Sequence, residues 1–146
     1  MFKIVPYEAK YLPDLTRLFN LWDDIPDLTT DQMQETVDNV EKNTNNKTFL
    51  AINEEGRPVG YIFVGDCHFV GTKSFLEIIQ IMIEEEYRGQ GIGKLMIKYV
   101  EDLYYEKGIR QVRLHSRVIL TKAHKFYEKI GFREFKQSKF FIKDLD

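Results

Sequence analysis

A cluster of glycines joins the most apolar segment of this chain to its most regular helical pattern. Residues 88–93 read Arg-Gly-Gln-Gly-Ile-Gly and follow the apolar run 75–83, which predicts a buried central β-strand. From Ile92 to Leu103 the apolar residues recur at three- and four-residue spacing, which predicts an amphipathic helix. The start of a helix carries unpaired N–H groups, so this order predicts a backbone site for an anion such as a diphosphate.

Two common phosphate-binding motifs do not match this turn. A Walker loop needs Gly-Lys followed by Ser or Thr, whereas Gly93-Lys94 is followed by Leu95. The dinucleotide-binding motif separates its second and third glycines by two residues and follows the first strand of a βαβ unit. Here the three glycines alternate with other residues and come after a run of predicted hairpins. The turn therefore belongs to another class of phosphate site.

The remaining periodicity divides the chain into further strands and helices without a linker or repeat. Thr29 and Gln32 form a capping-box pattern before a second helix. A last, aromatic-rich hairpin is predicted at 132–142. The predicted strands are 2–5, 48–52, 59–69, 75–83 and 112–114, and the predicted helices are 12–22, 30–42, 92–107 and 119–130.

Composition excludes several classes of protein. The 146 residues suit one domain, 1–146, with 43% hydrophobic and 30% charged residues. Cys67 is the only cysteine, which excludes an internal disulfide and favours the cytoplasm. A net charge of -2 gives no general attraction for nucleic acid. No apolar run is long enough to span a membrane, and the histidines show no metal-ligand spacing, so we expect no nucleic-acid, membrane or metal partner.

The glycine cluster resembles the coenzyme A signature of the GNAT superfamily of N-acyltransferases, Arg/Gln-x-x-Gly-x-Gly/Ala, which is here Arg88, Gly91 and Gly93. A second motif, Ala-x-x-Phe-Tyr-x-x-x-Gly-Phe at 123–132, follows at the family's usual distance. The order of elements fits over nearly the whole chain. The resemblance implies an α/β (α+β) GNAT-like fold, with a mixed, mostly antiparallel sheet of about six to seven strands flanked by about four helices.

The resemblance also implies acetyl-coenzyme A (acetyl-CoA) as donor and co-substrate, with no metal. The backbone amides of residues 88–94 would bind the pyrophosphate, and the strand through Ile81 and Ile83 would pair with the pantetheine arm. A tight turn without a ligand is the alternative for the glycines. The candidate cofactor-binding residues are Ile81, Met82, Ile83, Arg88, Gly89, Gln90, Gly91, Ile92, Gly93, Lys94, Ala123 and Phe126.

Tyr127 is the first candidate catalytic residue, because the matching tyrosine of the family donates a proton to the departing CoA thiolate. The alternative is an amphipathic-helix tyrosine that packs beside Phe126. The chain departs from the family pattern at Leu120, where many relatives have asparagine three residues before the motif alanine. The chain therefore lacks the polar side chain that would contact CoA or substrate from this position.

Glu77 is the second candidate, as a general base. It lies four residues before Ile81, so period-two alternation predicts that its side chain shares a face with Ile81 and Ile83. In the protein-lysine acetyltransferase branch of the superfamily, a general-base glutamate holds this offset from the glycine motif. The alternative is an exposed carboxylate at the start of the strand, paired with Lys73 or Arg113. The acidic run 84–86 is expected to be a solvated turn.

The resemblance places the acceptor beside the loop between the first two helices, where Trp22, Asp23, Asp24 and Asp27 are candidate substrate-binding residues. The carboxylates could attract a cation, or they could form a helix stop and a solvated turn. We expect a small cationic amine acceptor, polyamine-like or aminoglycoside-like. The alternatives are acetylation of a protein lysine or N-terminus, suggested by the Glu77 offset, and a CoA-binding regulatory domain without turnover. The last strand would offer an edge for a homodimer.

Overall fold

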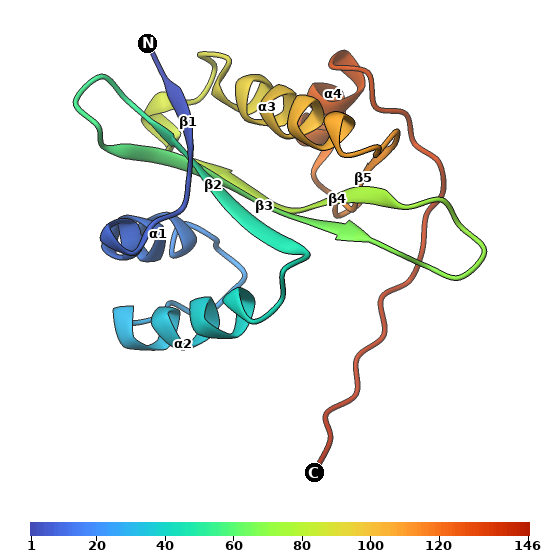
Figure 1. Cartoon of the computed structure of the whole chain (residues 1–146), viewed down its shortest axis with the longest axis horizontal. Coiled ribbons are helices and arrows are strands. Elements are labelled where there is room, and N and C mark those ends of the chain that lie inside the picture. The colour runs from blue at the N-terminus through green and yellow to red at the C-terminus, as the bar shows by residue number, and fades with distance from the viewer. The chain divides into compact units, whose positions relative to one another are not determined.

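A five-stranded sheet in the order β1-β2-β3-β4-β5 organises the first part of the molecule (Figure 1). The computed structural model describes all residues 1–146, in two compact units, 1–115 and 116–146. Three strand pairs are antiparallel and β4–β5 is parallel, which confirms the mixed, mostly antiparallel sheet. The strands are β1 (Lys3–Pro6), β2 (Asn46–Ile52), β3 (Pro58–Cys67), β4 (Phe75–Ile83) and β5 (Val112–Leu114).

Four α-helices confirm the predicted helix number. The first unit contains α1 (Leu12–Phe19) and α2 (Thr30–Glu41) on one face of the sheet, and α3 (Ile92–Glu106) on the other (Figure 1). The second unit contains α4 (Thr121–Lys129). Two short 3-10 turns, η1 (Ala9–Tyr11) and η2 (Glu85–Tyr87), precede α1 and α3. None of these helices combines the length and apolar character that crossing a membrane requires.

The capping box predicted for α2 is present. The backbone N–H of Gln32 donates to the Thr29 hydroxyl at 3.2 Å, and the backbone N–H of Thr29 donates to the Gln32 side-chain oxygen at 2.9 Å. Two of the unpaired donors at the helix start are thereby satisfied. The start of α2, and with it the end of the α1–α2 loop, is set by local chemistry.

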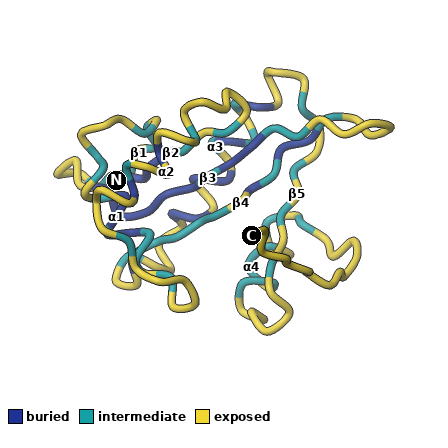
Figure 2. Tube along the Cα trace, turned by 90° about the horizontal axis from the view of Figure 1, so that it is seen from below, coloured by how far each residue is buried: buried dark blue, intermediate teal, exposed yellow.

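β3 is the most buried strand of the sheet (Figure 2). Its residues Val59, Tyr61, Ile62 and Val64 are each at most 1% exposed. The run 75–83, predicted as a central strand, forms β4 between β3 and β5, but it is not covered on both faces along its whole length, because burial in β4 falls from its start to its end. β5 pairs only with the first part of β4, so one edge of β4 stays open.

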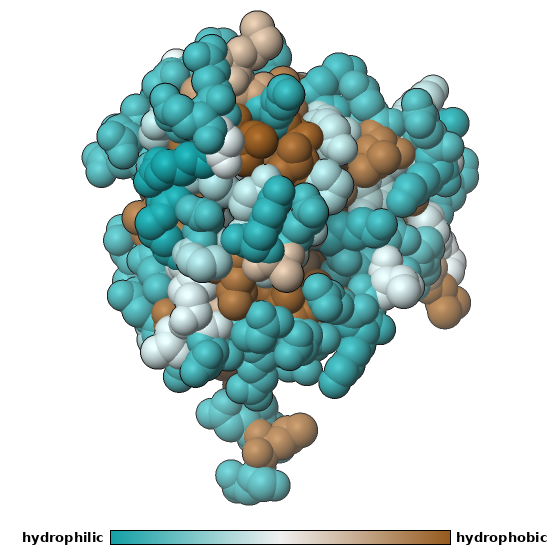
Figure 3. Space-filling view, turned by 60° about the vertical axis from the view of Figure 1, so that its left-hand side comes forward, coloured by the Kyte–Doolittle hydropathy of each residue, from teal (hydrophilic) through white to brown (hydrophobic).

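On the face drawn in Figure 3, polar residues predominate and apolar ones form small separate groups.

A β-bulge interrupts β4. Phe63 of β3 pairs with Gln80, and the next residue, Val64, pairs with Ile78, so Ile79 is an extra residue without a partner. A bulge of this kind resets the alternation of side chains along the strand. Residues before and after Ile79 therefore do not follow one unbroken period of two.

The predicted hairpin at 132–142 is not formed, and the sheet has five strands where six to seven were expected. Phe135, Phe140, Phe141 and Ile142 are 77%, 90%, 85% and 81% exposed. The composition favours strands, but a strand exists only where another strand accepts its N–H and C=O groups, and no backbone ladder includes these residues. The edge on which the homodimer expectation rested is therefore absent from this structure.

Candidate active site

The loop between β4 and α3 contains two glycines in the left-handed region. Gly89 has φ +79° and Gly91 has φ +83°, a conformation that favours glycine. Gly91 is the N-cap of α3, and its C=O accepts the first helical bond from Leu95 N at 3.0 Å. A Cβ at either glycine would meet nothing within 4 Å. These glycines are required by backbone conformation, and the space beside them is open to a ligand.

The N-terminus of α3 suits an anion. The N-cap Gly91 offers no side-chain acceptor, and the first turn contains no acidic residue, so the N–H groups of Ile92, Gly93 and Lys94 have no side-chain cap. A helix of 15 residues also presents about half a positive charge at this end. Ile92 and Gly93 are buried, so their contribution is their backbone. A diphosphate fits both the donors and the charge.

Arg88 and Gln90 bond within this loop. The Arg88 Nε donates to the Ile83 carbonyl at 2.9 Å, and its Nη2 lies 3.5 Å from the Met82 sulfur. The Gln90 side-chain amide donates to the Glu86 carbonyl at 3.5 Å. Both were predicted to bind the cofactor. In the structure, the Arg88 side chain holds the glycine loop against the end of β4.

Glu84 anchors the start of the loop and corrects the expectation of a solvated turn at 84–86. Its side chain is only 7% exposed, whereas Glu85 and Glu86 are exposed. Arg57 donates to both Glu84 oxygens at 2.9 and 3.1 Å, and Arg17 of α1 donates to one of them. A buried carboxylate requires such partners. This network holds α1, the β2–β3 turn and the end of β4 together.

The second half of β4 has an open edge. β5 pairs only with Leu76–Ile78. Glu84 N donates to Val59 O of β3 at 2.9 Å. In an antiparallel pair, every second residue directs its backbone N–H and C=O toward the partner strand. The backbone groups of Ile81 and Ile83, at odd positions from Glu84, therefore point away from β3. Arg88 already occupies the Ile83 carbonyl, which leaves both backbone groups of Ile81 for a ligand. An extended chain with amide groups can add to such an edge as a strand does.

Glu77 does not share a face with Ile81 and Ile83, because the bulge at Ile79 lies between them. Gln80 pairs with Phe63, and Glu77 pairs with Gly65, two residues further along β3. Glu77 and Gln80 therefore lie on the same face of the sheet, the one that α1 and α2 cover. The period of two assumed from the sequence fails at the extra residue. The prediction for the face of Glu77 is thus wrong, and its predicted role stays a prediction.

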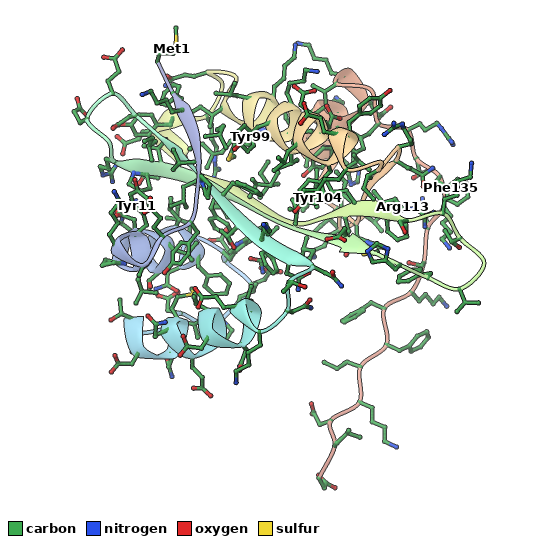
Figure 4. The ribbon with its side chains drawn as sticks, in the orientation of Figure 1. Met1, Tyr11, Tyr99, Tyr104, Arg113 and Phe135 are labelled. Atoms are coloured by element: carbon green, nitrogen blue, oxygen red, sulfur yellow. The ribbon has the colours of Figure 1, made fainter.

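The neighbours of Glu77 also differ from the alternative considered from the sequence. The Glu77 side chain is 28% exposed, and its Oε1 lies 3.7 Å from Nδ1 of His115. Arg113 stands opposite Glu77 in β5, but its guanidinium stacks 3.8 Å from the centre of the Phe75 ring (Figure 4). The ion-pair partner of Glu77 is therefore His115 when that histidine is protonated.

A hydrogen-bonded chain that the sequence did not reveal crosses the α1/α2 face. Trp22 Nε1 donates to the Tyr61 hydroxyl at 2.8 Å, which donates to Gln80 Oε1 at 3.1 Å. Burial raises the pKa of Tyr61 to about 12, so the hydroxyl remains a neutral donor. Gln80 could have been noticed as the one polar residue besides Glu77 in the run 75–83. Trp22, a predicted substrate residue, reaches this chain.

The α1–α2 loop presents its carboxylates to solvent. Asp23, Asp24 and Asp27 are exposed. The loop itself is held by Asn20, whose side-chain amide donates to the Leu28 carbonyl and accepts from the Leu28 N–H, both at 2.9 Å. The three aspartates therefore lie on a held loop, with their negative charge at the surface.

The second unit contains Tyr127 on α4. Its ring packs edge-to-face against Phe126 at 5.4 Å and Phe132 at 5.8 Å between ring centres, and burial raises its pKa. Phe132 N donates to the Tyr127 carbonyl at 2.9 Å, past Gly131 with φ +107°. Ala123 and Phe126 are half-buried on the same helix. The packing expected beside Phe126 is present, and the proton-donor role stays a prediction.

No group of three or more His, Cys, Asp or Glu side chains is arranged to hold a metal ion. His68 lies between Asp66 and Ser74, with ring nitrogens 2.8 and 2.6 Å from their oxygens. Its contacts are thus made within the β3–β4 hairpin. Cys67 is a free thiol. Its pKa is raised mainly by burial and, to a smaller extent, by the charges of Glu77 and Asp66.

Known proteins resemble this chain in sequence over most of its length. The model of the acetyltransferase (GNAT) family matches residues 14–132. The Schizosaccharomyces pombe protein N-alpha-acetyltransferase 30 is 27% identical over 137 residues, which are 94% of this chain and 87% of that protein. The uncharacterized protein YyaT of Bacillus subtilis is 33% identical over 84 residues, 58% of this chain. That match spans only about half, 51%, of the Bacillus protein.

A solved structure shares the fold. The aminoglycoside N-acetyltransferase AAC(6')-Iy, in complex with the bisubstrate analogue CoA-S-monomethyl-acetylneamine, has a TM-score of 0.83 at 20% identity, with 99% of each chain covered. At this identity the likeness concerns the fold alone. The family model, by contrast, matches the sequence over 14–132, which includes the glycine loop and Tyr127. The chain therefore belongs to the acetyltransferase (GNAT) family.

Proposed function

We propose that this chain is an acetyl-CoA-dependent N-acetyltransferase that acts on a primary amine of a small cationic molecule. One observation carries the proposal: the uncapped start of α3, at Gly91, follows the open edge of β4 along the chain, and Arg88 of the connecting loop donates to the Ile83 carbonyl at the end of that edge. Coenzyme A consists of a diphosphate followed by an extended arm with two amide groups. The site offers helix N–H groups and then a free strand edge in the same order.

The residues of the first unit would bind and orient. Acetyl-CoA supplies an acetyl group activated as a thioester. The N–H groups from Gly89 to Lys94 would hold the diphosphate, and the Ile81 N–H and C=O would pair with the amide arm. Arg88 and Glu84 position these groups through the bonds described above. Such positioning lowers the entropic part of the barrier to attack by the amine.

Tyr127 would act as the general acid. Burial raises its pKa, which keeps the phenol protonated and able to give its proton to the leaving sulfur. The family resemblance supports this role. The phenol would be reprotonated from solvent after each turnover.

Glu77 would act as the general base, directly or through a water molecule. Alkyl ammonium groups have a pKa of about 10.4, so the acceptor must lose a proton before it attacks. Glu77 lies on the α1/α2 face, as do Gln80 and the Trp22–Tyr61 pair. This shared face supports a role toward the acceptor rather than toward the cofactor arm.

Glu77→Gln is expected to lower kcat/KM by about tenfold or more, and mainly at low pH, where the unprotonated amine is scarce and removal of its proton matters most. The measurement is the pH–rate profile between mild acid and pH 9. Glu55→Gln, an exposed change in the β2–β3 turn, is the control. A Glu77→Gln profile that overlays the original at every pH would exclude Glu77 as the base.

The acceptor class has two candidates. The exposed carboxylates Asp23, Asp24 and Asp27 support a small cationic amine, and so does the solved relative that is bound to an acetylneamine analogue. The S. pombe relative is named an N-alpha-acetyltransferase and matches 94% of this chain, which favours a protein N-terminus as the second candidate.

A thiol-release assay tests the proposal. The protein is mixed with acetyl-CoA and with spermidine, an aminoglycoside, simple alkyl- and arylalkylamines, lysine peptides or peptides with a free N-terminus. We expect free CoA to appear with at least one small amine. Release with peptides alone would favour protein acetylation. Tight CoA binding without release across the panel would favour a regulatory CoA-binding domain and contradict the enzyme.

A further inference from the structure

A cavity of about 670 Å³ lies in the first unit, between α2 and the sheet, and continues past the end of β1 to α3, where Phe49, Tyr99, Leu103 and Lys107 line it. Four of its lining residues, Gln80, Phe63, Thr48 and Tyr7, form one row across the sheet. Gln80 pairs with Phe63, Phe63 pairs with Thr48, and Tyr7 N donates to Thr48 O at 2.9 Å. Paired residues share a face, so this row faces α1 and α2.

The cavity is elongated along this row. Neighbouring strands lie about 4.8 Å apart, so the backbone distance from Gln80 to Tyr7 is about 14 Å. One end reaches β4, whose open edge would receive the cofactor arm. The other end reaches the opposite edge of the sheet, beyond Pro6, the last residue of β1. A molecule that fills the cavity would therefore extend away from the β4 edge at Ile81 that is proposed for the cofactor arm.

The walls of the cavity are mainly apolar, and its charged groups do not favour a polycation. The lining contains one carboxylate, Glu41, against two lysines, Lys47 and Lys107. Tyr99, which Figure 4 labels on α3, lines the part of the cavity beyond β1 and packs against Phe49 at 5.4 Å between ring centres. Further ammonium groups would be desolvated here without partners. The principal apolar wall residues are Phe19, Leu28, Met33, Val37, Val40 and Phe63.

Polar groups stand at the two ends. At the β4 end, Gln80 and Tyr61 line the cavity, and the Tyr61 hydroxyl donates to Gln80 Oε1. At the far end, the Tyr7 hydroxyl is buried and has no hydrogen-bond partner. Burial, followed by the charges of Glu41 and Asp38, raises the pKa of Tyr7, so the hydroxyl is a neutral donor. A buried donor without a partner is costly, and a ligand acceptor would satisfy it.

We propose that this cavity binds the body of the acceptor, and that the acceptor is a primary amine on an apolar body. Its amine would lie at the Gln80 end, and a hydrogen-bond acceptor on the body would take the Tyr7 hydroxyl at the far end. The inference rests on the proposed function and names its substrate class. An arylalkylamine with a distal hydroxyl has this chemistry, whereas a polyamine lacks the apolar body.

Direct binding tests the inference separately from turnover. Phenylbutylamine, its para-hydroxy analogue and spermine are titrated by calorimetry into the protein saturated with CoA. We expect both aromatic amines to bind at least about tenfold more tightly than spermine. Spermine binding as tightly as the aromatic amines would overturn the substrate class. Binding of aromatic amines without thiol release would support the cavity and contradict the enzyme.

Two substitutions locate the ligand. Thr36→Trp places a large ring at an exposed lining position of α2 and is expected to weaken phenylbutylamine about tenfold or more. Glu35→Trp, exposed and outside the lining, is the control. Tyr7→Phe keeps the packing and is expected to abolish any preference for the para-hydroxy analogue. Unchanged affinity in Thr36→Trp, or an unchanged preference in Tyr7→Phe, would overturn the placement.

Discussion

Gly91→Val is expected to weaken CoA binding by more than about 100-fold while the protein remains folded. The φ of +83° at Gly91 costs an L-residue about 1–2 kcal/mol, and more for a β-branched one. Relaxation to an ordinary φ would turn the first N–H groups of α3. If the loop held its shape, the valine side chain would occupy the open space at the helix start. Both outcomes remove the close approach of a diphosphate to the backbone.

Gly56→Val is the matched control for this change. Gly56 has φ +80°, and a Cβ there would also meet nothing within 4 Å, but it lies in the turn between β2 and β3. The two variants should therefore lose similar stability in thermal unfolding, and only Gly91→Val should lose CoA affinity by calorimetry. Equal CoA affinity in the two variants would contradict the pyrophosphate site at Gly91.

Tyr127→Phe is expected to lower kcat by about 100-fold with little change in the affinity for acetyl-CoA. Phenylalanine keeps the ring that packs between Phe126 and Phe132, so the unit should remain folded. What is removed is the proton for the leaving sulfur. Because that proton matters only once the carbon–sulfur bond breaks, kcat and kcat/KM should fall together and binding should not.

The pH dependence gives a second readout for Tyr127. Since burial raises its pKa, the acid form is present throughout the neutral range and is lost only as pH rises above the ordinary value of about 10. The original enzyme should lose activity at that high pH, and Tyr127→Phe should lack this limb. Tyr105→Phe, a change at a 59% exposed tyrosine, is the control. Unchanged kcat in Tyr127→Phe would exclude the proton-donor role.

The elements around the glycine loop could be predicted because their signals are local. The apolar run 75–83 became β4 with the same bounds, and the helical spacing from Ile92 became α3. The capping box at Thr29 formed as expected. Each depends on residues within a few positions of one another, so sequence spacing carries the information.

The same spacing could not predict the face of Glu77 or the fate of the tail. The bulge at Ile79 arises from pairing with β3, and no residue type in the run 75–83 marks it. The segment 132–142 has the aromatic content of a strand, but pairing decides whether a strand forms.

The sequence by itself determined the glycine loop before α3, since left-handed glycines and a helix start are properties of a few neighbouring residues. Only the tertiary structure decided which β4 groups are free, how the Trp22–Tyr61–Gln80 chain is connected, and that a long apolar cavity begins beside Gln80. These features join residues up to about 100 positions apart, and such contacts depend on strand register and helix packing rather than on local preference.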